Sequence, residues 1–235
     1  MHTAIITGAG SGIGSHAAEL LAAEGYAVVL VGRTESKLDD AADRIAEAVE
    51  AATVEAMPTD VTDPEAVERL IAAVQDKFGR VDVLCNVAGD APLNPIPQNT
   101  YAAWRRCIDT NLTAVVLLTS RLFPVMEEQG GGTIVNVSSM ASFDPFPGFS
   151  MYAAAKVGVN MFTRSTAEEG KDKNISAVCV APGAVETGML RGLFSEEVIP
   201  KESALDPRDV ARAVVDCATG KRGYDPGETI AMPSP

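Results

Sequence analysis

The chain has 235 residues and a formal net charge of −13 at pH 7, and 46% of its residues are hydrophobic. With a mean hydropathy of +0.10 it can build a large core, whereas its acidity disfavours nucleic acid and anionic membranes as partners. No apolar run approaches the roughly 18 residues that a membrane span requires, and the N-terminus has a strand pattern rather than that of a signal peptide.

Strand-like and helix-like patterns alternate along the chain. Short apolar runs predict strands at residues 3–7, 26–32, 53–61, 81–89, 132–139, 175–183 and, as an edge strand, 228–232. Helical spacing predicts helices at residues 13–24, 36–51, 64–78 and 101–128, one that carries Tyr152 and ends near residue 169, and one that begins at residue 207. Asp63-Pro64 and Asp206-Pro207 each supply an N-cap followed by a first-turn proline.

The alternation continues without a linker, which predicts a single domain over residues 1–235. Strands that are apolar on both sides are typical of parallel sheets covered on both faces. The predicted fold is therefore α/β: a doubly wound Rossmann fold with a mostly parallel, seven-stranded sheet and helices on both faces.

The four cysteines are scattered and form no CxxC pair. We expect them to be reduced core residues of a cytoplasmic protein. With only two histidines and no His/Cys cluster, no metal site is predicted.

The first predicted strand leads into TGAGSGIG, residues 7–14. The dinucleotide fingerprint GxGxxG is not met here, and the pattern present is TGxxxGxG, through Gly8, Gly12 and Gly14. Glycines in such a turn allow a pyrophosphate to approach the backbone, and the following helix N-terminus offers free N–H groups. The alternative is a glycine-rich strand–helix turn that binds nothing.

Arg33 and Thr34 follow the second predicted strand, where no carboxylate is present. A carboxylate there would hold the 2′-hydroxyl of NAD, whereas an arginine accommodates the 2′-phosphate of NADP. The residues therefore favour NADP(H), with NAD(H) possible. The alternative for Arg33 is a solvated surface charge.

Tyr152 and Lys156 are one helical turn apart, and Ser139 ends the fifth predicted strand. A tyrosine loses its proton near pH ~10, and an ammonium at i+4 on the same helix face is expected to lower that pKa. Tyr152 is thus predicted to exchange a proton with a substrate oxygen, to which Ser139 would hydrogen-bond. Alone, the spacing also fits an ordinary surface pair.

Seven elements follow one another in register: TGAGSGIG, Asp60-Val61, Asn86-Val87-Ala88-Gly89, Asn111, Ser139, the Tyr152/Lys156 pair, and Pro182-Gly183 with Thr187. Together they resemble the short-chain dehydrogenase/reductase (SDR) family over essentially the whole chain. The resemblance implies an NAD(P)(H)-dependent oxidoreductase that interconverts a ketone, or a 3-ketoacyl group, and a secondary alcohol. It also implies a homotetramer or homodimer.

The resemblance assigns catalysis to Asn111, Ser139, Tyr152 and Lys156. It assigns cofactor binding to Gly8, Ser11, Gly12, Ile13, Gly14, Arg33, Thr34, Asp60, Val61, Asn86, Ala88, Gly89, Tyr152, Lys156, Pro182, Gly183, Val185 and Thr187. Structural roles are the alternatives for several of these: a polar bridge for Asn86 and Asn111, a loop cap for Asp60, a helix cap for Thr187.

Two residues depart from the family pattern. Gly10 stands where many members have serine, and Ser11 stands where many NADP-preferring members have a basic residue. The 2′-phosphate would then depend mainly on Arg33.

The substrate is expected to contact Ser139, Tyr152, Phe146 and Met189, within walls formed by residues 89–97, 140–150 and a short substrate segment at about 187–204. This favours a small or medium ketone, or a 3-ketoacyl group carried by an acyl-carrier protein. A non-catalytic NAD(P)-sensing module is the contrasting hypothesis, although it would be expected to lack one of the catalytic residues.

Overall fold

All seven strands join one parallel sheet in the order β3-β2-β1-β4-β5-β6-β7. The computed structural model describes residues 1–235. The strands are β1 (Thr3–Thr7), β2 (Ala27–Gly32), β3 (Val54–Pro58), β4 (Val83–Asn86), β5 (Gly132–Val137), β6 (Ile175–Pro182) and β7 (Thr229–Met232). The strand order reverses between β1 and β4, and open α/β sheets bind ligands beyond the carboxyl ends of the strands at such a point.

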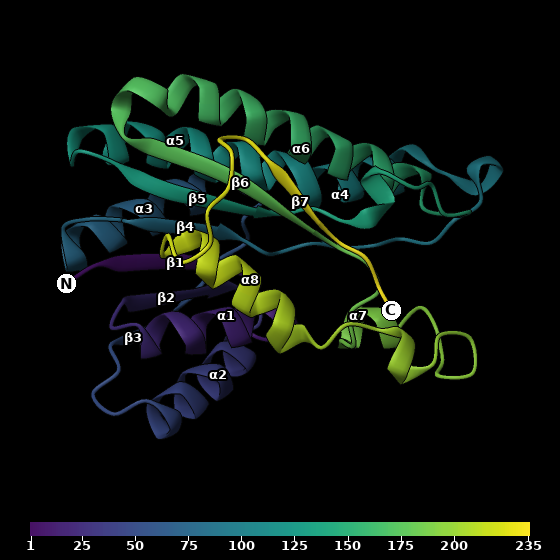
Figure 1. The fold of residues 1–235 in the computed structure, drawn as a ribbon, viewed down its shortest axis with the longest axis horizontal. Coiled ribbons are helices and arrows are strands. Elements are labelled where there is room, and N and C mark those ends of the chain that lie inside the picture. The colour runs from purple at the N-terminus through teal and green to yellow at the C-terminus, as the bar shows by residue number, and fades with distance from the viewer.

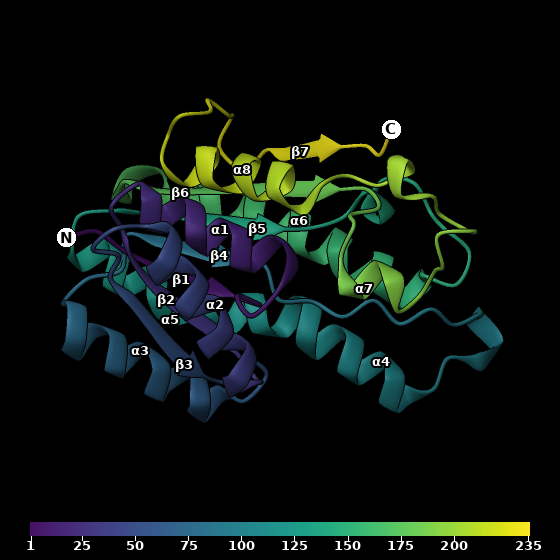
Figure 2. The ribbon, with the colours of Figure 1, turned by 90° about the horizontal axis from the view of Figure 1, so that it is seen from below.

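Helices cover both faces of the sheet (Figures 1 and 2). They are α1 (Gly12–Ala23), α2 (Glu35–Ala48), α3 (Pro64–Phe78), α4 (Tyr101–Ile108), α5 (Ala114–Glu128), α6 (Ser150–Gly170), α7 (Gly188–Arg191) and α8 (Pro207–Ala218). Buried side chains of α1, α2 and α8 form one core cluster with the sheet, and those of α3, α5 and α6 form another. The predicted doubly wound Rossmann fold is confirmed, and its sheet is wholly parallel.

The predicted helix caps are present. The Asp63 carboxylate accepts a hydrogen bond from the Glu65 N–H, and the Asp206 carboxylate accepts one from the Arg208 N–H. Each cap precedes a first-turn proline, as expected for a helix that starts sharply. None of the helices is both long and apolar enough to cross a membrane.

The helix predicted over residues 101–128 has an irregular turn. A π-helical turn, Asp109–Thr113, separates α4 from α5 and contains the buried Asn111. Such a turn holds one extra residue, and π-turns are frequent at functional sites. Periodicity alone did not predict it, because the apolar pattern continues across it.

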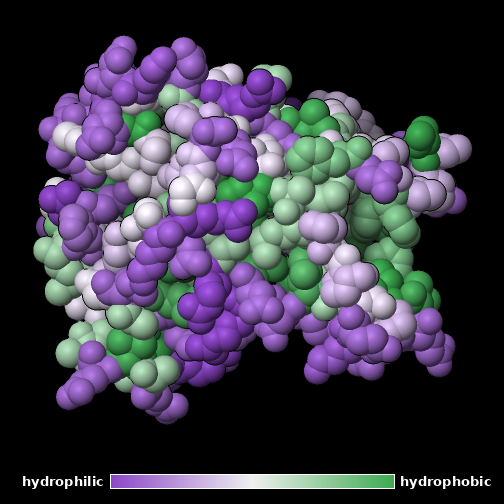
Figure 3. Space-filling view, viewed as in Figure 1, coloured by the Kyte–Doolittle hydropathy of each residue, from purple (hydrophilic) through white to green (hydrophobic).

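The loops that follow the strands gather at one end of the sheet together with α7, whereas the N-terminus lies at the opposite end (Figure 2). Apolar side chains are prominent on the right of the space-filling view, over the carboxyl ends of the strands (Figure 3). The predicted site residues lie at this end.

Candidate active site

The turn after β1 is built for close approach to the backbone. Gly8 and Gly12 have positive φ angles of 68° and 54°, which L side chains rarely adopt. A Cβ atom at Gly14 would lie 2.4 Å from the Gly8 carbonyl oxygen, so no side chain fits there. Ser11 is the N-cap of α1 without a side-chain cap bond, and the first N–H groups of the helix face this turn.

Thr7 fixes the loop after β4 against this turn. Its hydroxyl accepts hydrogen bonds from the N–H groups of Val87 and Ala88, each at 3.0 Å. A Cβ atom at Gly8 would lie 3.0 Å from Ala88. The two loops at the switch point of the sheet are thus in contact, and they form one wall.

A polar cavity of about 190 Å³ begins at this turn and runs past the end of β2. Its lining includes Arg33, Thr34, Asp60 and Val61, the residues predicted to contact the ribose and adenine end of a dinucleotide. Asp60 is held by hydrogen bonds from the N–H and hydroxyl groups of Thr62, which keep the pKa of its carboxyl below the usual value. Asp60 therefore stays ionised and fixed.

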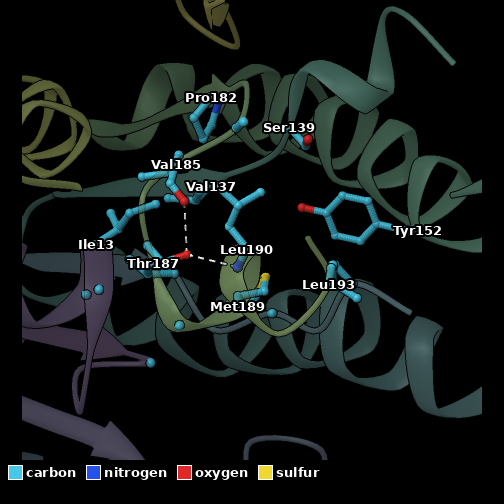
Figure 4. A pocket seen from close by; sticks show the side chains of 18 of the residues that line it. Ile13, Val137, Ser139, Tyr152, Pro182, Val185, Thr187, Met189, Leu190 and Leu193 are labelled. Carbon is cyan, nitrogen blue, oxygen red and sulfur yellow. Dashed lines mark hydrogen bonds between the residues drawn. The ribbon is translucent and has the colours of Figure 1, made fainter. Parts of the chain in front are cut away.

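A second cavity, of about 260 Å³, shares the glycine turn and Ala88-Gly89 with the first and holds the predicted reactive groups. Tyr152 and Lys156 enter it from α6, and Ser139 enters from the loop that follows β5. Figure 4 shows the hydroxyls of Ser139 and Tyr152 directed into this space, opposite Met189, Leu190 and Leu193.

Lys156 is almost fully buried, with 3% of its surface exposed. Its ammonium donates a hydrogen bond of 2.8 Å to the Val137 carbonyl oxygen and lies 5.6 Å from the centre of the Tyr152 ring. Burial lowers the pKa of Lys156 to about 8, because an ammonium without a carboxylate partner is costly in an apolar environment.

The expectation that Lys156 lowers the pKa of Tyr152 is not met in this structure. Burial raises the pKa of Tyr152 to about 12, and the Ser139 hydroxyl acts in the opposite direction with a smaller effect. The desolvation of the phenolate is the largest effect, and the Lys156 ammonium, which is bonded to Val137, does not offset it. Tyr152 is accordingly a neutral hydroxyl near pH 7, the form that donates a proton.

Asn111 lies next to this cluster but does not line the cavity. Its amide donates to the carbonyl oxygens of Asp90, at 2.7 Å, and Cys107, at 2.9 Å, and its oxygen accepts from the Asp90 N–H. A Cβ atom at Gly89 would come within 3.0 Å of the Asn111 oxygen and 3.7 Å of the Lys156 nitrogen. The glycine thus lets these two side chains come close together.

The rest of the second cavity is mostly apolar. Its apolar side chains are Ile13, Val87, Ala88, Ala91, Val137, Phe149, Pro182, Ala184, Val185, Met189, Leu190, Leu193 and Phe194. Lys156 is the one ionisable cation among the lining residues, and no carboxylate lines it. An uncharged ligand fits such walls better than a charged one.

The substrate segment is held by its own contacts. Thr187 caps α7, since its hydroxyl accepts from the Leu190 N–H and donates to the Val185 carbonyl (Figure 4). Arg191 pairs with Glu186 and donates to the carbonyl oxygens of Phe194 and Ile199.

Three predicted site residues do not line either cavity: Asn86, Asn111 and Phe146. The Asn86 amide donates to Asn136, and Asn136 donates to Thr163, so Asn86 ties β4 to β5 and α6. Phe146 is half exposed and packs against Phe149 and Phe194 from outside. The Asn86 side chain is therefore a polar bridge, the structural role named above as its alternative. Phe149, and not Phe146, lines the apolar cavity.

The lining also includes residues that the sequence analysis did not select. Lys37 lines the polar cavity beside Arg33, and Ala91 and Leu193 line the apolar one. Lys37 follows Arg33 by four residues in the first turn of a predicted helix, and this spacing could have indicated that the two cations lie on the same side. Ala91 and Leu193 lie within the predicted substrate walls at residues 89–97 and 187–204, but the sequence has no pattern that distinguishes them from their apolar neighbours.

These residues fit a nicotinamide dinucleotide. Gly14 lets the first turn of α1 pack directly against the Gly8 carbonyl, so that the N-terminus of α1 lies at the glycine turn without a side-chain cap. One polar and one apolar cavity share this turn as part of their lining. Fold and site together define a Rossmann-fold oxidoreductase.

The chain belongs to the short-chain dehydrogenase family, whose sequence model, described as "short chain dehydrogenase", matches residues 2–198. An uncharacterized oxidoreductase of Staphylococcus aureus is 31% identical, over 98% of this chain and 96% of its own length. The 3-oxoacyl-(acyl-carrier-protein) reductase FabG of Vibrio cholerae is 34% identical, over 97% and 93%.

Solved structures of oxidoreductases have the same fold as this chain. Levodione reductase superimposes with a TM-score of 0.92 at 28% identity, over 99% of this chain and 96% of that chain. Actinorhodin polyketide ketoreductase with NADPH has a TM-score of 0.91 at 29% identity, over 99% and 95%. A 7α-hydroxysteroid dehydrogenase complexed with NADH and a 7-oxo bile acid conjugate has the same TM-score at 28% identity, over 98% and 92%. The family thus uses both NADPH and NADH on small molecules.

Proposed function

We propose that this enzyme reduces a small or medium apolar ketone to a secondary alcohol, reversibly, with NADPH as the hydride donor. The observation that carries the proposal is the position of the Tyr152 and Ser139 hydroxyls, which face one apolar cavity that is continuous with the groove at the glycine turn. Tyr152, Ser139, Lys156 and Asn111 are the proposed catalytic residues.

When bound, the nicotinamide supplies the hydride that the carbonyl carbon accepts. Ser139 would donate a hydrogen bond to the carbonyl oxygen, where negative charge develops. Tyr152 would transfer its proton to that oxygen, which breaks the phenolic O–H bond and leaves a phenolate. In the reverse direction the phenolate takes the proton from the alcohol.

Lys156 and Asn111 would restore the tyrosine proton. The ammonium lies beside the Tyr152 ring, and its pKa of about 8 allows it to release and regain a proton near neutral pH. By the family resemblance, Lys156 would also bind the ribose hydroxyls of the nicotinamide, and Asn111 would hold a water that connects Lys156 to solvent. The hydrogen bonds that fix Asn111 to Asp90 and Cys107, next to this cluster, support the proposed role.

Arg33 supports the proposed preference for NADPH. It lines the polar cavity at the end of β2, where Gly32 replaces the carboxylate that would hold a 2′-hydroxyl. Arg33 has no carboxylate within ion-pair distance, so its charge is available to a phosphate.

A 3-ketoacyl thioester is the second candidate substrate, because the Vibrio cholerae relative is named a 3-oxoacyl-(acyl-carrier-protein) reductase. Arg191, one of the two cations of the substrate segment, is paired with Glu186 and is not free to bind an acidic carrier protein, which leaves only the exposed Lys201 there. The pairing favours the simple ketone.

We further propose that residues 1–235 act as one cytoplasmic cofactor-binding domain, with residues 187–204 as its substrate segment, and that the chain forms a homotetramer or homodimer. Val157 and Met161 support the association, since they lie on one face of α6 and are 49% and 57% exposed. Multi-angle light scattering would report the mass of the assembly.

The test is a turnover screen in which the purified enzyme is mixed with aliphatic, alicyclic and aromatic ketones and with 3-ketoacyl thioesters, each with NADPH and with NADH. We expect oxidation of NADPH with at least one uncharged ketone and a lower kcat/KM with NADH. Cofactor binding without turnover on any ketone or thioester would contradict the proposal, and turnover on thioesters alone would favour the second candidate.

A further inference from the structure

Lys37 is a second cation at the polar cavity. It occupies the first turn of α2, which begins at Glu35, and it lines the cavity together with Arg33 and Thr34. Neither Lys37 nor Arg33 forms an ion pair within the chain, although eleven other pairs are present. Two unneutralised cations therefore border one polar space.

Gly10 determines how closely this part of α2 approaches the glycine turn. A Cβ atom built at Gly10 would lie 3.0 Å from the Cβ atom of Lys37 and 3.5 Å from its backbone carbonyl. A contact of 3.0 Å is tighter than ordinary van der Waals contact, so a side chain at position 10 would push Lys37 outward. Gly10 has no positive φ angle, so close packing rather than backbone strain is the structural reason for glycine here.

Gly10 and Ser11, the two residues that depart from the family pattern, are connected through Lys37. Ser11 leaves the glycine turn without the basic residue that many NADP-preferring relatives have there. Gly10, one position earlier, leaves space in which Lys37 stands against the same turn from the neighbouring helix. A cation supplied by α2 can replace a cation missing from the turn, because both positions border one cavity.

Asp60 is the one carboxylate that lines this cavity, and it forms no ion pair with either cation, although the attraction of Arg33 contributes to the lowered pKa of Asp60. Its Oδ1 atom accepts two hydrogen bonds from Thr62, at 3.0 and 2.7 Å. Two cations and one carboxylate thus line the cavity, and the excess positive charge suits a phosphate, to which hydrogen bonds from cations are strong.

We propose that Lys37 is a specificity-determining residue that binds the 2′-phosphate of NADPH together with Arg33, and that Gly10 is required for its position. The proposal rests on the NADPH preference proposed above and extends it to a residue outside the family's glycine turn.

The experiment measures the dissociation constants of NADPH, NADH and 2′,5′-ADP by titration calorimetry, without turnover. Lys37→Gln is expected to weaken NADPH and 2′,5′-ADP about tenfold and NADH less than about twofold. Arg44→Gln is the matched control, because Arg44 lies on the same helix, is exposed and bonds only the Asp40 carbonyl. It should leave all three constants unchanged.

Gly10→Ser tests the connection. In the wild-type background Gly10→Ser should weaken the binding of NADPH more than that of NADH. In the Lys37→Gln background it should have little further effect on this difference, so that the losses in NADPH affinity from the two substitutions are non-additive. Additive losses would overturn the role of Gly10. Equal losses for NADPH and NADH in Lys37→Gln, or equal losses in Lys37→Gln and Arg44→Gln, would overturn the role of Lys37.

Arg33→Gln separates this inference from the proposed function. If Arg33→Gln lowers NADPH affinity selectively while Lys37→Gln does not, the NADPH preference holds and the inference fails. If the wild-type protein binds NADH at least as tightly as NADPH, the proposed preference fails, and the inference fails with it.

Discussion

The buried ammonium of Lys156 should make the stability of this protein depend on pH in a way that a single substitution removes. The pKa of Lys156 falls from an ordinary 10.5 to about 8 in the folded chain. Between these values the unfolded chain binds the proton and the folded chain does not. The free energy of unfolding must therefore rise with pH in this window. Below pH 8 both states bind the proton, and the full cost of burying the charge is present.

The magnitude follows from the shift. A difference of about 2.5 pKa units corresponds to about 3 kcal/mol at roughly 1.4 kcal/mol per unit. Most of it, about 2 to 3 kcal/mol, should develop between pH 7 and pH 10. The buried cysteines act in the opposite direction, since burial raises the pKa values of Cys85, Cys179 and Cys217.

Comparison with Lys156→Met cancels the contributions of Cys85 and Cys217, because both proteins retain these thiols and Lys156 does not act on them; Cys107 and Cys179, whose pKa values Lys156 lowers, cancel in part. Urea unfolding at half-unit pH intervals from 7 to 10 would give the free energy of unfolding of each protein. We expect the difference, wild type minus variant, to increase by about 2 to 3 kcal/mol across the series. The lost bond to the Val137 carbonyl shifts the whole curve equally. Parallel pH profiles would refute the assignment of a low lysine pKa.

Three further predictions concern side chains around the cavity. Ser139→Ala should lower kcat about 10²-fold with NADPH affinity unchanged, because the hydroxyl acts on the developing alkoxide; stopped-flow hydride transfer measures this, and an unchanged rate would contradict it. Asn111→Ala should lower the free energy of unfolding, measured with denaturant, by about 2 to 4 kcal/mol, because backbone groups of Asp90 and Cys107 lose their hydrogen-bond partner. An unchanged free energy of unfolding would contradict this and would show that water replaces the amide. Arg191→Gln should raise KM for the ketone about fivefold with little change in NADPH affinity, since Arg191 holds the substrate segment through Glu186 and two carbonyl oxygens; a change in NADPH affinity instead would assign Arg191 to the cofactor.

The fold was predictable because the local patterns agree with one another. Strands buried on both faces are continuous apolar runs, and the Asp-Pro pairs mark helix starts to the residue. The π-turn at Asp109–Thr113 was not predictable, because it inserts one residue without changing the composition. The seven elements of the site were assigned from their order and spacing, which resemble those of the short-chain dehydrogenase/reductase family. Those that follow strands lie close together because parallel strands bring their carboxyl ends to one edge of the sheet.

The remaining features depend on distances that the sequence does not contain. The pKa of Tyr152 was expected to be lowered by Lys156, but burial dominates, and the Phe149 ring that packs on Tyr152 contributes to this burial. Asn86 bonds Asn136 on the neighbouring strand, a partner 50 residues away. Lys37 lines the polar cavity because α2 packs against Gly10. These are tertiary contacts, to which local patterns are insensitive.

The central claim is that Tyr152 donates the proton in a hydride-transfer reaction. Tyr152→Phe keeps the ring that packs on Phe149 and removes the hydroxyl that faces the cavity. The direct measurement is single-turnover oxidation of bound NADPH by a ketone that the wild-type enzyme reduces, with the dissociation constant of NADPH measured on the same samples. The account predicts a rate at least about 10³-fold lower and an NADPH affinity within about twofold of the wild-type value. A variant that retained most of its rate would contradict it.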